Sequence, residues 1–139
     1  MAVEPEQARV RPAKKAGTWY TKEKSKLSKE FQLWLADAKL KKPIDGVVKA
    51  IICPHAGYMY CGATAAYSYC HVDPSKIKRV FILGPDHCGA AGSGKHRCLL
   101  SNATHWATPF GDVEVDTETV AKLYATQAFD FLSMKEDAS

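Results

Sequence analysis

The chain has 139 residues, a formal net charge of +4 and a hydrophobic content of 46%, which permits a core and sets one compact domain as the expected upper limit. Lysine and arginine gather in its first part but form no aromatic-interleaved basic motif, so we expect a solvated face and no nucleic-acid partner. No run is apolar enough for a membrane span or a secretory signal. Five cysteines without such a signal indicate reduced thiols in the cytoplasm, with a nuclear location left open.

Residues 1–15 contain two prolines and few apolar side chains, which predicts a flexible tail followed by one domain over residues 16–139. The turn at residues 16–20 carries Trp19, which by its residue type is interpreted as a core anchor. A helix should follow, because five apolar residues recur on one helical face before Pro43 and Gly46, namely Leu27, Phe31, Trp34, Leu35 and Ala38.

Two apolar runs favour strands with histidines directly after them. Residues 47–53 are suited to a central strand covered on both faces, and residues 79–83 predict a second strand. A helix over about residues 61–70 would connect them as a right-handed βαβ unit. The carboxyl ends of two parallel strands meet at one sheet edge, so His55 and His87 are expected to emerge at the same edge.

The remaining elements complete an α/β pattern. Residues 97–101 and 112–116 predict short strands, separated by an irregular segment at 104–109. Asp116 should cap a following helix, with Glu118 in its first turn. The expected fold class is therefore α/β, with a mixed central sheet and helices on both of its faces.

Three motifs in order, AGTWY, PHAGYMYCG and FILGPDH, resemble the Memo family over about residues 16–135. This resemblance implies a fold similar to class III extradiol dioxygenases, which are non-haem iron enzymes. Family members are roughly twice as long as this chain, so the sequence resembles the amino-terminal half of one. A cysteine that joins the two motif histidines in the family pattern has no counterpart here.

The resemblance also implies a site. His55 and His87 would be ligands of a copper or iron ion, and Trp19 and Tyr60 would line the pocket. The leading hypothesis is metal-dependent, dioxygenase-like redox activity, which leaves the assignment as an enzyme uncertain. A second hypothesis is a non-catalytic module in signalling or cell motility that holds a peptide or phosphorylated ligand there without metal. A third is an inactive partial product. The metal, the substrate and the oligomeric state stay open.

The apolar character of residues 47–53 also predicts how a chain shorter than its family members would differ from them. A strand of this kind expects cover on both faces and partners at both edges. Without the further elements that the family fold supplies, an exposed sheet edge and an apolar patch are expected.

Overall fold

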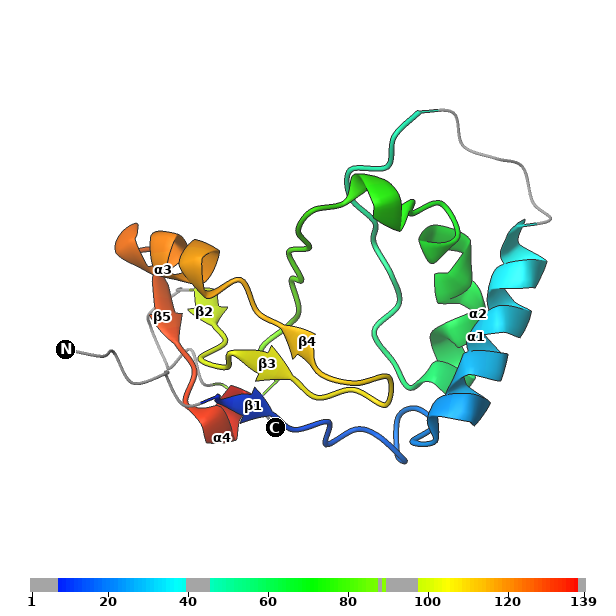
Figure 1. Cartoon of the computed structure of the whole chain (residues 1–139), viewed down its shortest axis with the longest axis horizontal. Helices are drawn as coiled ribbons and strands as arrows, with labels where there is room; N and C mark the ends of the chain where they lie inside the picture. The colour runs from blue at the N-terminus through cyan, green and yellow to red at the C-terminus, as the bar shows by residue number, and fades with distance from the viewer. Residues whose placement is uncertain (1–7, 40–45, 88, 90–97, 138–139) are drawn as a thin grey trace. The chain divides into compact units, whose positions relative to one another are not determined.

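The computed structural model describes residues 8–39, 46–87, 89 and 98–137, and it confirms the α/β class. The elements in chain order (Figure 1) are β1 (Val10–Arg11), α1 (Lys24–Lys39), α2 (Tyr58–Tyr69), the 3-10 turn η1 (Pro74–Lys76), β2 (Cys98–Leu100), β3 (His105–Trp106), β4 (Val113–Glu114), α3 (Thr117–Ala125), β5 (Phe129–Phe131) and α4 (Met134–Asp137). The sequence predicts one domain, whereas the chain divides into two compact units, residues 15–80 and residues 1–14 with 81–139. No helix in the described ranges is long and apolar enough to cross a membrane.

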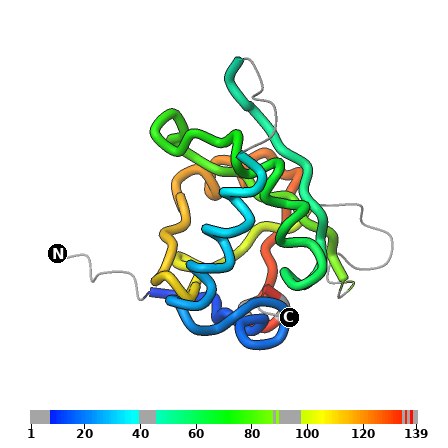
Figure 2. Tube along the Cα trace, turned by 90° about the vertical axis from the view of Figure 1, so that its right-hand side faces the viewer, coloured from blue at the N-terminus to red at the C-terminus, as the bar shows by residue number. Residues whose placement is uncertain are grey.

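The unit of residues 15–80 is built on a pair of helices. Helix α1 lies along α2 in both views (Figures 1 and 2). The predicted apolar stripe of α1 faces this contact, since Leu27 and Ala38 are buried and the other stripe residues are half-buried. Helix α2 contributes Cys61 and Ala66 to the core. Its small side chains allow the helices to approach closely. The helix expected over about residues 61–70 is confirmed, although α2 begins three residues earlier.

The second unit holds two small sheets. One has the order β1-β3-β4, with β1 parallel to β3 and β3 antiparallel to β4. In the other, β2 pairs in parallel with β5. Helix α3 packs on β5, where the rings of Tyr124 and Phe131 lie 4.7 Å apart. Its predicted cap is confirmed, because the backbone N–H of Thr119 donates to Asp116 Oδ1 at 2.8 Å.

The strands predicted at residues 47–53 and 79–83 are wrong for this structure. Both segments are extended, but neither belongs to a strand. Among the described residues, no hydrogen bond between two backbone groups joins residues 47–54 to another segment. Ile52 and Leu83 are each 94% exposed. A strand needs a neighbouring backbone as well as apolar side chains, and no described segment supplies that neighbour. Exposed apolar side chains, which the sequence predicts for a shortened domain, are therefore present in each segment.

The tail predicted for residues 1–15 also needs correction. Residues 1–7 lie outside the described residues, but Val10 and Arg11 form β1 and pair with β3. Arg11 Nε also donates to Asp137 Oδ1 at 2.9 Å. A residue 126 positions further along the chain therefore holds part of the expected tail in place. The local sequence around residues 10–11 does not reveal so distant a partner.

Candidate functional site

The turn at residues 16–20 is joined to the start of α2 by the backbone. The N–H of Tyr58 donates to the carbonyl oxygen of Trp19 at 2.7 Å. Gly57 precedes the helix, and a Cβ atom built on it would lie 3.2 Å from the same oxygen. This approach is closer than most Cβ contacts, so glycine at position 57 allows the two motifs to meet. The Trp19 turn and the His55 loop thereby become neighbours.

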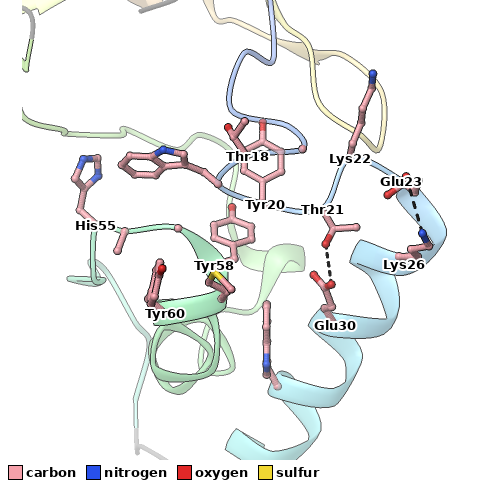
Figure 3. Close-up of a pocket in the computed structure, with 16 residues that line it drawn as sticks. Thr18, Tyr20, Thr21, Lys22, Glu23, Lys26, Glu30, His55, Tyr58 and Tyr60 are labelled. Atoms are coloured by element: carbon pink, nitrogen blue, oxygen red, sulfur yellow. Dashed lines mark hydrogen bonds and ion pairs between the residues drawn. The ribbon is translucent and has the colours of Figure 1, made fainter.

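These segments and residues of α1 line an open pocket of about 1000 Å³. Trp19, His55 and Tyr60, which the sequence singled out, all line it. The rings of Trp19 and His55 lie 5.9 Å apart with an interplanar angle of 58°. Trp19 is 41% exposed and Tyr60 is 80% exposed, so neither is a core residue in this structure. Figure 3 shows His55 and Tyr60 on one side of the pocket, with Lys22 and Lys26 on the other.

Sequence reasoning missed the centre of the pocket. The rings of Tyr20 and Tyr58 are tilted by 31° with their centroids 5.3 Å apart, and the Phe31 ring of α1 has its centroid 5.7 Å from that of Tyr58 (Figure 3 shows the tyrosine pair). Tyr58 directly follows Gly57 at the start of α2, and this position beside the His55 motif was the signal that could have placed it in the pocket. Tyr20 is the last residue of the turn motif, which was a weaker signal.

The charged groups of the pocket differ in how they are engaged. Glu30 accepts a hydrogen bond from Thr21 Oγ1 at 2.7 Å, and Glu23 lies 4.0 Å from Lys26 Nζ. Lys15 Nζ lies over the Trp19 ring, 5.6 Å from its centroid. Lys22 and Lys26 are the two lysines that line the pocket itself. The amino-terminal end of α2 also faces this space, and helix amino termini favour negative charge.

The pKa of the Tyr58 phenol is raised above 10.0, first by burial and then by the neighbouring Tyr69 and Tyr20 side chains and the Cys61 thiol. The folded chain therefore holds this proton more tightly than the unfolded chain does. The stabilisation is complete below pH 10 and is lost as pH rises through the folded pKa. Burial and Cys53 raise the pKa of Tyr69 as well, so it adds to the same trend.

We expect the thermal midpoint of the wild-type chain to fall more steeply above about pH 10 than that of Tyr58→Phe. Circular dichroism melts between neutral pH and pH 11 measure this. Tyr60→Phe removes an exposed phenol two residues away and should keep the wild-type slope. Equal slopes in wild type and Tyr58→Phe would contradict the burial argument.

The two predicted metal ligands lie in different compact units of the chain. His55 belongs to the unit of residues 15–80, and His87 belongs to the other unit. No group of three or more His, Cys, Asp or Glu side chains in the described ranges is placed to hold a metal ion. His55 is the sole histidine among the described residues that line the pocket. Copper or iron binding by His55 and His87 therefore stays a prediction.

Comparisons with known proteins agree with the motifs. The model of the Memo-like protein family matches residues 11–139. Protein MEMO1 of Danio rerio is 44% identical over 127 residues, which cover 91% of this chain and 40% of that protein. Protein MEMO1 of Xenopus tropicalis is 43% identical over 131 residues, covering 94% and 41%. The memo-1 homolog of Caenorhabditis elegans is 39% identical over 130 residues, covering 94% and 35%. The chain thus spans about two-fifths of the length of these relatives.

Proposed function

Since the chain belongs to the Memo family of Memo-like proteins, we propose that its pocket binds a phosphorylated peptide and that the chain acts as a ligand-binding module. One observation carries this proposal. Trp19, His55 and Tyr60 surround a pocket of about 1000 Å³ that also holds two lysines. A pocket with aromatic walls and a few charged groups is typical of a binding site that fixes the orientation of its ligand.

The lining holds two lysines and two glutamates, so its side chains carry no net formal charge, and the case for an anionic ligand depends on where the positive groups lie. The carboxylate of Glu30 already accepts from Thr21, and Glu23 lies near Lys26. Lys22 and Lys26, together with the amino-terminal end of α2, favour a phosphate or carboxylate group. Phosphate carries more charge than a carboxylate near neutral pH, so a phosphorylated residue gains more from the same lysines.

The aromatic groups support a ligand with its own ring. Trp19 and Tyr60 are exposed at the pocket, and each offers a face or an edge to an aromatic side chain. A phosphotyrosine side chain satisfies both requirements, with its ring against these residues and its phosphate near the lysines. We therefore choose a phosphotyrosyl peptide as the probe.

We expect Trp19→Ala to weaken binding of a fluorescein-labelled phosphotyrosyl peptide by about 30-fold, which corresponds to about 2 kcal/mol for an aromatic anchor. Tyr60→Ala should weaken it by a smaller factor. Lys26→Ala should weaken binding a few-fold at low salt and less at high salt, because exposed charges are screened. Fluorescence anisotropy in EDTA measures all three without any metal.

Lys29→Ala is the matched control, since Lys29 is an exposed lysine of the same helix that does not line the pocket. It should bind as the wild type does. Binding that is indifferent to Trp19→Ala and Tyr60→Ala, with unchanged circular dichroism, would argue against this pocket. Repeating the titration with Cu²⁺ or Fe²⁺ in place of EDTA, in wild type and in His55→Ala and His87→Ala, tests the metal hypothesis separately.

A further inference from the structure

The unit of residues 15–80 is far more basic than the rest of the chain. It contains 12 lysines and arginines against five aspartates and glutamates, which gives it a net formal charge of +7. The whole chain carries +4, so the remaining residues together carry −3. Such an asymmetry of charge within one chain indicates that the basic part meets an anionic partner.

Four exposed lysines lie around the pocket and along the first half of α1. We call this surface the basic face, and it consists of Lys15, Lys22, Lys26 and Lys29. Lys15 Nζ lies 5.6 Å from the centroid of the Trp19 ring. Lys22 and Lys26 line the same side of the pocket (Figure 3). Lys29 follows Lys26 by three residues in α1, so the two project from one side of the helix. The positive charge therefore continues from the pocket onto the outer side of α1.

The carboxylates near the basic face neutralise only part of this charge. Glu30 and Asp37 accept hydrogen bonds from neutral hydroxyl groups, at 2.7 and 3.1 Å. In the described ranges, Glu23 is the one carboxylate that pairs with a lysine of the basic face, and its oxygen lies 4.0 Å from Lys26 Nζ. The other three lysines of the face make no ion pair with a described residue. Their charge is available to a partner.

The side chains of the face select among anionic partners. Lysine is a point charge on a flexible stem, whereas arginine is preferred where a phosphate or carboxylate is bound in a bidentate manner. Residues 15–78 contain no arginine. Leu33 is 72% exposed and lies one turn beyond Lys29 on the same side of α1, and Trp19 is 41% exposed. Spread positive charge with exposed apolar side chains beside it suits the headgroup region of an anionic bilayer.

We propose that the basic face docks on a membrane surface that contains anionic phospholipids. The contact is peripheral, with lysines at the headgroups and Leu33 at the boundary of the acyl chains, so it needs no helix that crosses the bilayer. It does not rest on the proposed peptide binding, because Lys29 and Leu33 do not line the pocket.

Co-sedimentation with phosphatidylcholine vesicles that contain about one-third phosphatidylserine tests this proposal, in EDTA and at about 0.1 M salt. The wild-type chain should bind them at least tenfold more tightly than pure phosphatidylcholine vesicles, and less tightly as salt is raised. Lys29→Glu should weaken binding at least fivefold, since one lysine near an anionic surface contributes about that factor. Leu33→Gln should weaken it at least twofold at every salt concentration.

Lys49→Glu is the matched control, because it makes the same charge change at an exposed position outside the basic face. Its neighbour Val48 lines a small cavity with His71, just past the end of α2. This control should change vesicle binding by less than twofold, and circular dichroism checks that each variant keeps its helices.

Three results overturn the proposal. They are equal binding to anionic and neutral vesicles, equal losses in Lys29→Glu and Lys49→Glu, and binding of a glutamate-rich peptide or duplex DNA without binding of anionic vesicles. Lys29→Glu should bind the phosphotyrosyl peptide as the wild type does. Failure of the vesicle assay and failure of the peptide titration are therefore distinguishable.

Discussion

Replacing Gly62 with valine is expected to lower the free energy of unfolding of the α1–α2 pair by about 3 kcal/mol. Gly62 is buried in α2, and a Cβ atom built on it would lie 2.5 Å from Cζ3 and 2.6 Å from Cη2 of Trp34. Those distances are far below van der Waals contact, so the indole or the whole of α1 must move away. Valine adds two more methyl groups at the same point and has a helix propensity well below that of alanine.

Alanine at position 62 separates the effect of overlap with Trp34 from the effect of helix propensity. It should restore up to about 1 kcal/mol of helix propensity relative to glycine, while still overlapping the Trp34 ring. A smaller loss than that of valine is therefore expected. Urea unfolding followed by circular dichroism measures each variant. Ala63→Val, at an exposed position of the same helix, should report the propensity cost without the overlap.

A double-mutant cycle of Gly62→Ala with Trp34→Ala tests the mechanism. Removal of the indole should cancel most of the overlap, so that Gly62→Ala becomes neutral or stabilising in that background. An unchanged cost in both backgrounds would contradict the close approach of α2 to Trp34.

Local patterns carried most of what the sequence predicted correctly. The apolar stripe of α1 and the Asp116 cap of α3 depend on residues within four positions of one another, and both are present. The pocket residues Trp19, His55 and Tyr60 were found because of their motifs, and the structure places them around one cavity. Their chemical role is a matter for the titrations proposed above.

Non-local pairing explains what the sequence did not reveal. Strands β3 and β5 have only two and three residues, and each depends on a partner far away in the chain. Residues 47–53 show the reverse case, because their strong apolar pattern predicted a strand that has no pairing partner among the described residues. Strand formation is decided by the neighbouring backbone, which a single stretch of sequence does not reveal.

Replacing Asp137 with alanine is expected to destabilise the second unit by about 2–3 kcal/mol, because it removes a buried carboxylate from charged hydrogen bonds. Asp137 is 6% exposed. It accepts from Arg11 Nε at 2.9 Å and from Ser101 Oγ, and Ser101 Oγ in turn accepts from Trp106 Nε1 at 3.1 Å. These contacts join both ends of the described chain to the loop between β2 and β3.

The loss should be visible at Trp106, since Arg11 also lies over its ring at 4.9 Å from the centroid. Urea unfolding in a Trp19→Phe/Trp34→Phe background, followed by fluorescence, isolates this indole. Asp137→Asn keeps one carbonyl oxygen as an acceptor and should cost less than alanine. Lys122→Ala is the control, because its contact with Glu118 lies between two exposed side chains and should contribute at most about 0.5 kcal/mol. An Asp137→Ala midpoint equal to that of the background variant would show that the cluster does not hold the two ends of the chain together.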